Sequence, residues 1–208
     1  MERTAIMGQI TRVTKKTDNR FLNFYELDTV KKTGKPGRYF LSSRARTEED
    51  LEIRTHADRA DGVMMFMLYG EQHDRIVLIR QYRFPIDGFI YELPAGLVED
   101  GEDLHEGAIR EVLEETGLEL ELLEVDPSFE KAYYTTVGMT DESVSLVYGY
   151  ASGDLGHQHL EDSEEITVVL ADREEARRIL KEERISLAAA YTLMHFINDE
   201  DPFAFLKA

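Results

Sequence analysis

Three glutamates stand close together near the middle of the chain, at positions 111, 114 and 115. If this segment is helical, a rotation of about 100° per residue puts the three carboxylates on one face, where their like charges repel. A bound divalent cation would compensate that repulsion. Mg²⁺ takes oxygen ligands of this kind, with Mn²⁺ as a substitute. The alternative is an ordinary solvated acidic helix face.

The surrounding sequence predicts the helix that would carry these carboxylates. Helical spacing runs from about Asp103 to Thr116, and Gly117 follows at a position suited to a left-handed C-cap. Ile109, Val112, Leu113 and Thr116 occupy the arc beside the glutamates and are expected to face the core.

The residues around this helix form a longer pattern, which is a more specific indication of function than the three glutamates alone. The pattern consists of Gly96, Glu102, Arg110, Glu111, Val112, Glu114, Glu115, Gly117 and Leu118. It resembles the Nudix box at every specified position. The resemblance implies an α/β/α sandwich in which Glu111 and Glu115 are the principal metal ligands and Glu114 supports them. Arg110 would orient the carboxylates or, alternatively, form a surface ion pair with Glu106.

Upstream features are similar to the ADP-ribose pyrophosphatase branch of that family. They are Gln81-Tyr82-Arg83 and Glu92-Leu93-Pro94-Ala95-Gly96. The resemblance implies that Arg83 meets the pyrophosphate, whose geometry suits a guanidinium fork. The backbone carbonyl of Ala95 would be a metal ligand, and Glu92 would contact substrate or metal, or else point to solvent.

Downstream, Thr136–Glu142 is similar to a Ser-Pro-Gly-x-Ser-Asp-Glu segment of the same branch. Gly138 and Glu142 are therefore candidate substrate-binding residues. Val137 departs from the pattern, because the branch has proline there. The departure leaves GDP-mannose and related nucleoside diphosphate sugars open as substrates beside ADP-ribose.

A polar loop over residues 152–164 provides candidates for the catalytic base. The branch draws a carboxylate from a corresponding loop, which implies Asp162 or Glu164, with Glu164 also a candidate metal ligand. An acidic loop can equally be exposed to solvent and have no catalytic role. His157 and His159 in the same loop could serve as bases or ligands, although loop histidines are more often neither.

The remaining pattern predicts an α+β fold, with a mixed sheet flanked by helices. Strands are expected over 6–13, 21–30, 38–41, 63–68, 76–79, 89–93, 118–125, 128–134, 143–150 and 166–171. Asp172 and Ser186 should cap two further helices. The first strands predict a small N-terminal antiparallel sheet over residues 1–57, followed by a catalytic domain over residues 58–208.

The amino-acid composition limits the kinds of binding partner and the cellular compartment that can be expected. The formal net charge of −18 argues against nucleic acid and anionic membranes as partners. The absence of cysteine excludes disulfides, thiolate nucleophiles and zinc–sulfur sites. No apolar run approaches the length that a bilayer requires, and no signal peptide is recognisable, so a soluble cytoplasmic protein is expected.

The sequence therefore predicts a Mg²⁺-dependent hydrolase that splits the pyrophosphate of a nucleoside diphosphate sugar. ADP-ribose, giving AMP and ribose 5-phosphate, is the leading substrate. Two alternatives stay open: a nucleotide-sensing Nudix domain without activity, and a housecleaning pyrophosphatase for oxidised nucleotides or dinucleoside polyphosphates. The resemblance also implies a homodimer formed with the help of the N-terminal sheet.

Overall fold

The computed structural model describes all of the 208 residues except 1–7, 58, 100, 157–164 and 208. The chain forms two compact units. The first consists of residues 1–59 and 132–143, and the second of residues 60–131 and 144–208. A segment from the middle of the chain thus belongs with the N-terminal residues.

The first unit is built on an antiparallel sheet in the order β1-β2-β3. Its strands are β1 (Gln9–Lys15), β2 (Asn23–Val30) and β3 (Pro36–Ser43), and the unit also contains α1 (Glu52–Thr55) and β9 (Tyr133–Tyr134). Residues that alternate along the strands bury one face, because successive side chains of a strand point to opposite sides. The resulting core consists of Val13, Tyr25, Leu27, Leu41 and Leu51. The predicted N-terminal antiparallel sheet is confirmed.

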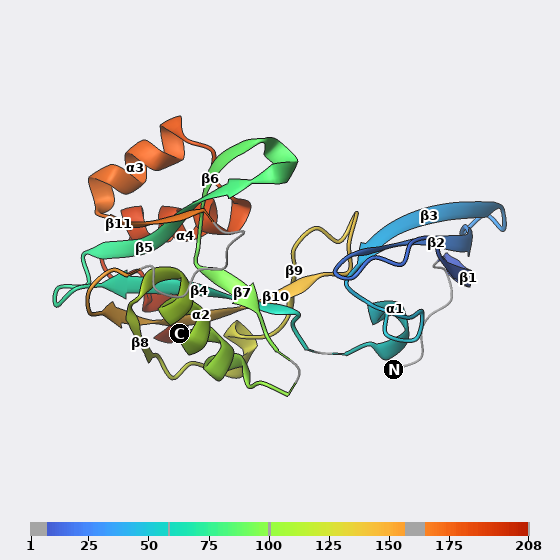
Figure 1. Ribbon diagram of the computed structural model, residues 1–208, viewed down its shortest axis with the longest axis horizontal. Helices are drawn as coiled ribbons and strands as arrows, with labels where there is room; N and C mark the ends of the chain where they lie inside the picture. The colour runs from blue at the N-terminus through green and yellow to red at the C-terminus, as the bar shows by residue number, and fades with distance from the viewer. Residues whose placement is uncertain (1–7, 58, 100, 157–164, 208) are drawn as a thin grey trace. The chain divides into compact units, whose positions relative to one another are not determined.

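The second unit contains a mixed sheet in the order β11-β5-β4-β10-β8 (Figure 1). Its strands are β4 (Gly62–Tyr69), β5 (Arg75–Arg83), β8 (Glu119–Leu122), β10 (Ser143–Ser152) and β11 (Ile166–Ala171). β10 runs parallel to β4, whereas β5 and β11 are antiparallel to each other. The predicted mixed sheet is therefore confirmed.

The sheet splits in the region that carries the predicted site. β4 and β5 pair only at Leu68–Ile76 and Tyr69–Arg75. Farther along, β5 pairs with β6 (Gly88–Glu92), while β4 pairs with β7 (Ala95–Leu97). The chain passes from β6 to β7 through Leu93 and Pro94, and the Pro94 carbonyl accepts a hydrogen bond from the Met65 N–H at 2.9 Å.

Helices cover both faces of this sheet. α2 (Leu104–Thr116) packs on one face against Val63, Met65, Met67 and Val77. α3 (Arg173–Glu182) and α4 (Leu187–Asn198) pack on the other against Phe66, Leu68, Ile76 and Leu78. The two sets alternate along β4 and β5, as expected for strands that are buried on both faces. This layering confirms the predicted α+β sandwich.

Within the described residues, three short 3₁₀ turns complete the fold: η1 (Phe84–Ile86), η2 (Pro127–Phe129) and η3 (Ala204–Lys207). The strand predicted over residues 128–134 is wrong, since η2 occupies its beginning and only β9 is extended. Pro127 has the φ that a helical turn needs, and the Asp126 side chain accepts a hydrogen bond from the Ser128 N–H at 2.9 Å. The strand predicted over residues 118–125 is shortened to β8.

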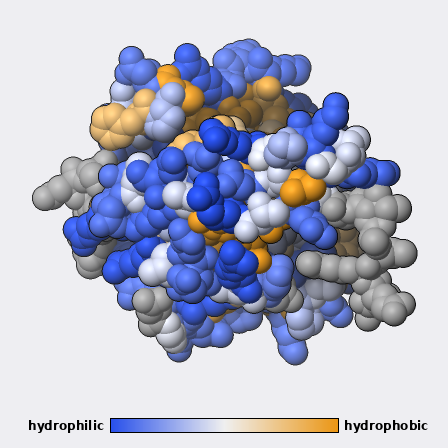
Figure 2. Space-filling model, turned by 90° about the vertical axis from the view of Figure 1, so that its right-hand side faces the viewer, coloured by the Kyte–Doolittle hydropathy of each residue, from blue (hydrophilic) through white to orange (hydrophobic). Residues whose placement is uncertain are grey.

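None of the described helices combines the length and the apolar composition of a membrane-spanning segment. The face seen in Figure 2 is largely hydrophilic, and its hydrophobic residues form small separate patches. This surface agrees with the 32% of residues that are charged.

Candidate active site

The helix that carries the three glutamates begins and ends at specific capping residues. The Asp103 side chain accepts a hydrogen bond from the His105 N–H at 2.9 Å, as an N-cap does. At the other end Gly117 adopts the left-handed conformation, with φ 74°, and its N–H donates to the Leu113 carbonyl. The helix and both of its predicted ends are confirmed.

The burial of α2 differs from the predicted pattern. Val112 and Thr116 face the core, but Ile109 and Leu113 are 44% and 46% exposed. Ala108 and Gly107 are buried instead. The assignment of Ile109 and Leu113 to the core face was therefore wrong. The sheet contacts the side of the helix that carries small residues, because these let the helix approach closely.

Glu115 is almost completely buried, with 4% of its surface exposed. A buried carboxylate needs hydrogen-bond donors, and one of its oxygens accepts from the Ala95 N–H at 2.9 Å. This contact joins the C-terminal half of α2 to the first residue of β7. The spacing of Ala95 and Glu115 in the sequence does not predict this contact, because the contact depends on how the helix packs on the sheet.

Gly96 provides space for a second carboxylate of the helix. A Cβ atom at this position would overlap the carboxylate of Glu111. A larger residue at position 96 would force the Glu111 carboxylate to move, because this side chain lies directly against the backbone of β7. Ala95 and Gly96 bring this strand into contact with two of the three glutamates.

Arg110 links the carboxylates to one another and to the loop before the helix. Its Nε and Nη2 donate to the two oxygens of Glu102 at 2.8 and 2.9 Å. Its Nη1 donates to Glu111 at 2.8 Å and to Glu114 at 3.1 Å. Nη2 also donates to the Leu97 carbonyl at 3.0 Å. Arg110 therefore orients two of the candidate ligands.

This arrangement shifts the protonation equilibria of the pair. The hydrogen bonds from Arg110, together with one from the Glu99 N–H, lower the pKa of Glu102 to about 2. The same bonds raise the pKa of Arg110 above its ordinary value, chiefly through Glu102. Both groups stay charged across the physiological pH range.

The donor set at α2 suits a hard divalent cation. It offers only carboxylate and carbonyl oxygens, which are the ligands that Mg²⁺ prefers. Among the residues that the structure describes, no three His, Asp or Glu side chains are already gathered as a metal site. Arg110 and the Ala95 N–H hold these carboxylates in their present orientation. The space kept open at Gly96 is what allows the Glu111 oxygens to lie against the strand.

Arg83 and Glu92 form an ion pair on the neighbouring strands β5 and β6. The Arg83 Nε lies 2.6 Å from a Glu92 oxygen. Arg83 is half-exposed, whereas Glu92 is mostly covered. Glu92 therefore faces Arg83, and not solvent alone.

Gly138 and Glu142 belong to the first unit, together with the N-terminal sheet. The Gly138 carbonyl accepts a hydrogen bond from the Tyr39 hydroxyl at 2.7 Å. Glu142 forms an ion pair with Arg44, at 2.9 Å to Nε and 2.8 Å to Nη2. Tyr39 and Arg44 could not be identified from sequence patterns, because each lies nearly a hundred residues away from its partner in the chain.

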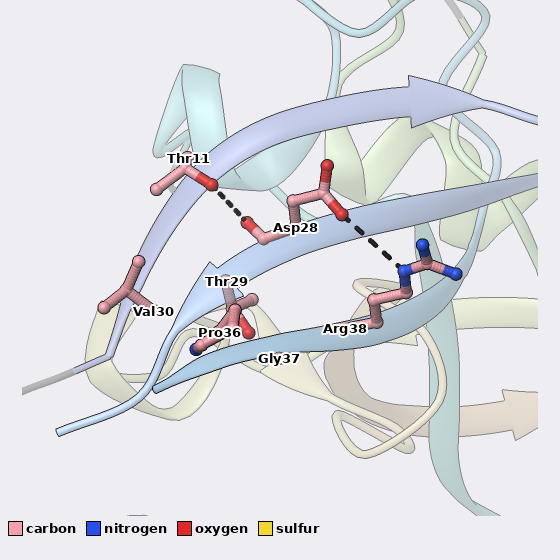
Figure 3. Close-up of a pocket in the computed structure, with 7 residues that line it drawn as sticks. All are labelled: Thr11, Asp28, Thr29, Val30, Pro36, Gly37 and Arg38. Atoms are coloured by element: carbon pink, nitrogen blue, oxygen red, sulfur yellow. Dashed lines mark hydrogen bonds and ion pairs between the residues drawn. The ribbon is translucent and has the colours of Figure 1, made fainter. Parts of the chain in front are cut away.

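The candidate bases Asp162 and Glu164 lie outside the described residues, and so do His157 and His159. A separate hollow of about 380 Å³ lies on the N-terminal sheet (Figure 3). Three of its lining residues contact one another: the Thr11 hydroxyl donates to the Asp28 carbonyl, and Arg38 faces the Asp28 carboxylate. This hollow contains none of the predicted site residues.

Comparison with known proteins identifies several relatives of this chain. A methanol dehydrogenase activator of Bacillus methanolicus is 36% identical over 116 residues, which cover 54% of this chain and 59% of that protein. An ADP-sugar pyrophosphatase of Mus musculus is 33% identical over 90 residues, covering 42% and 41%. An ADP-ribose pyrophosphatase of Bacillus subtilis is 29% identical over 123 residues, covering 58% and 64%. The chain spans about half the length of the curated relatives it matches.

The fold has a counterpart among solved structures. The crystal structure of an ADP compounds hydrolase superposes with a TM-score of 0.65 at 15% identity, over 94% of this chain and 95% of that chain. The NUDIX domain matches residues 58–193, a region that includes α2, β7 and the Arg83–Glu92 pair. The chain therefore belongs to the NUDIX domain family.

Proposed function

We propose that this protein hydrolyses the pyrophosphate bond of nucleoside diphosphate sugars in a Mg²⁺-dependent reaction, with ADP-ribose as the leading substrate. The observation that carries the proposal is the joint fixing of the Glu111 and Glu115 carboxylates against Gly96 and Ala95 of β7. Relatives named ADP-ribose and ADP-sugar pyrophosphatase support the choice of an ADP-containing substrate.

Glu111, Glu114 and Glu115 would hold Mg²⁺ together with the Ala95 carbonyl and Glu164. A bound cation would supply Lewis acidity, which would activate the attacking water and neutralise charge on the phosphate oxygens. Arg110 keeps the Glu111 and Glu114 carboxylates oriented through its hydrogen bonds. The guanidinium of Arg83 turns from Glu92 to a phosphate oxygen of the substrate, which it can bind through paired N–H donors.

In the reaction, a water oxygen forms a bond to one phosphorus while the bond from that phosphorus to the bridging oxygen breaks. A carboxylate oxygen of Asp162 or Glu164 accepts the proton of the attacking water. ADP-ribose then yields AMP and ribose 5-phosphate. Comparing Asp162→Asn with Glu164→Gln identifies the base, since its loss lowers kcat with little change in substrate affinity.

A panel of nucleoside diphosphate sugars incubated with Mg²⁺, including ADP-ribose and GDP-mannose, tests the function directly. We expect ADP-ribose to give the highest kcat/KM. Glu115→Gln should lower kcat by more than about 100-fold, because it removes a ligand charge that lies at the site itself. Glu106→Gln is the matched control, since Glu106 is an exposed residue on the same helix.

The alternatives predict different results in the same assay. A nucleotide-sensing domain would bind ADP-ribose without turnover, and a housecleaning enzyme would prefer oxidised nucleotides or dinucleoside polyphosphates. All three glutamates of α2 are present, which favours catalysis. Absence of turnover with every compound would refute the proposed activity.

We further propose a cytoplasmic homodimer in which residues 1–57 contribute to the interface between copies. Exposed hydrophobic side chains on the N-terminal sheet, among them the stacked rings of Phe24 and Phe40, support this role. Light scattering of the purified protein should give twice the mass of one chain. A monomer over the micromolar range would contradict the interface.

A further inference from the structure

Gln81 on β5 is a buried amide whose oxygen has no hydrogen-bond partner. Its side chain is 6% exposed. Among the described residues, its Oε1 is the buried side-chain oxygen or nitrogen atom that lacks any hydrogen bond. Leaving such an acceptor unpaired destabilises the folded state, and most buried polar groups in folded proteins have a hydrogen-bond partner.

The register of the sheet shows which face Gln81 occupies. Gln81 is opposite Ile90 of β6 on one side and Ile166 of β11 on the other. Side chains of a strand repeat on one face every second residue, so Gln81 shares its face with Val77 and Arg83. Val77 packs in the cluster formed with α2. Gln81 thus lies on the face of the sheet that carries the α2 carboxylates.

The Arg83–Glu92 ion pair crosses over this position. Glu92 is opposite Ile79, two residues before Gln81 on β5, and Arg83 lies two residues after it. An ion pair between residues 83 and 92 on this face must therefore pass over the Gln81–Ile90 pair. When Arg83 leaves Glu92 for a phosphate, the groups that cover the Gln81 amide change.

We propose that Gln81 is a specificity-determining residue whose Oε1 accepts a hydrogen bond from a sugar hydroxyl of the bound substrate. The inference rests on the proposed function. An amide oxygen needs a donor, and pyrophosphate oxygens carry no proton to donate near neutral pH. The donors that lie within a few bonds of the pyrophosphate are the hydroxyls of the two flanking riboses. The unpaired acceptor is then satisfied only in the complex.

The test is Gln81→Met, which keeps the length of the side chain and removes the acceptor. Substrates are ADP-ribose and four analogues, each lacking one ribose hydroxyl, at the 2′ or 3′ position of the adenosine ribose or the 2 or 3 position of the terminal ribose. Gln72→Met is the matched control, because Gln72 is exposed in the turn between β4 and β5. Wild-type turnover of ADP-ribose tests the proposed function independently of the variant.

We expect Gln81→Met to lower kcat/KM for ADP-ribose by about tenfold. This is the effect of losing one hydrogen bond and leaving the sugar hydroxyl of the substrate without an acceptor. One deoxy analogue should lose as much with the wild type, and that analogue should be turned over equally by both proteins. Thermal melting should show an equal or higher Tm for the variant, since its folded state no longer buries an unpaired acceptor. A purely structural glutamine would instead lower Tm.

The proposal is overturned if the wild type hydrolyses ADP-ribose and Gln81→Met has the same kcat/KM. It is also overturned if every deoxy analogue loses the same factor with both proteins. If Gln81→Met does not fold, the wild type alone still tests the proposal. Equal kcat/KM for ADP-ribose and all the deoxy analogues would show that none of these hydroxyls donates a hydrogen bond to Gln81.

Discussion

Arg110 and Glu102 form a two-pronged ion pair, with Nε–Oε1 and Nη2–Oε2 distances of 2.8 and 2.9 Å. Glu102 precedes α2, and Arg110 stands two turns into the helix. Because Arg110 also contacts Glu111 and Glu114, the loop before the helix is connected to the candidate metal ligands. The family box places Glu102 and Arg110 at fixed positions, and their contact gives a physical reason for that spacing.

This ion pair predicts a pH-dependent contribution to stability. The pKa of Glu102 is lowered from 4.5 to about 2, so folding favours the charged carboxylate. The contribution is complete above pH 4.5, decreases as the pH falls, and is lost below pH 2. Glu102→Gln should lower the free energy of unfolding by about 1.5 kcal/mol at pH 7. Urea unfolding at pH 7, 4 and 2.5 measures the difference.

The difference between Glu102→Gln and the wild type should shrink at pH 2.5. Glu106→Gln, on the same helix but exposed, should match the wild type at every pH. A difference for Glu102→Gln that is constant with pH would contradict the charged pair as its source.

The helix and its caps could be predicted because their signals are local. Asp103 and Gly117 sit at the ends of the helical pattern, and each acts through residues within one turn. The exposure of Ile109 and Leu113 could not be predicted in this way. Which side of an amphipathic helix meets a sheet depends on the strands beneath it, and here the small residues Gly107 and Ala108 provide the closest approach.

Gly96→Ala tests the close packing of Glu111 against β7. The added methyl would overlap the Glu111 carboxylate, which must move away from its present position. We expect kcat/KM for ADP-ribose to fall by about 100-fold, as for displacement of a catalytic group by about 1 Å. Circular dichroism should show an unchanged fold.

If Gly96→Ala retains wild-type activity, the position of the Glu111 carboxylate is not important for the reaction. Restored activity at high Mg²⁺ concentration would show that the variant loses cation affinity and not the geometry of attack.

Arg83→Ala tests the role of the β5 arginine in substrate binding. Removing a charged donor that pairs with phosphate should raise KM for ADP-ribose by about 10–100-fold, with a smaller effect on kcat. Arg75→Ala provides the matched control, because Arg75 is exposed at the other end of the same strand. Steady-state kinetics over a range of ADP-ribose concentrations separates the two constants. Equal KM values for the two variants would remove Arg83 from the binding site.

The parts of the site that could not be predicted from the sequence are contacts between residues that lie far apart in the chain. The Glu115 carboxylate meets the Ala95 N–H, and the Glu142 carboxylate meets Arg44. Neither pair has a spacing that a local pattern recognises. The unpaired oxygen of Gln81 is likewise visible only when the register with β6 and β11 is known.

Substitutions at the N-caps of α2 and α3 should have similar effects on stability but different effects on activity. Asp103 accepts a hydrogen bond from the His105 N–H at the start of α2, and Asp172 accepts from the N–H groups of Glu174 and Glu175 at the start of α3. Replacing either aspartate by alanine should lower the free energy of unfolding by about 1 kcal/mol. Urea denaturation measures this loss, with Asp74→Ala as an exposed control.

Activity should distinguish the two caps. Fraying of the first turn of α2 loosens the segment next to Glu102, and through Arg110 it disturbs Glu111 and Glu114. α3 packs on the opposite face of the sheet and contacts none of these residues in the described structure. Asp103→Ala should therefore lower kcat several-fold at a temperature where both variants are folded, whereas Asp172→Ala should keep the wild-type kcat. Equal kcat values for both variants would show that the order of the first turn of α2 does not reach the carboxylates.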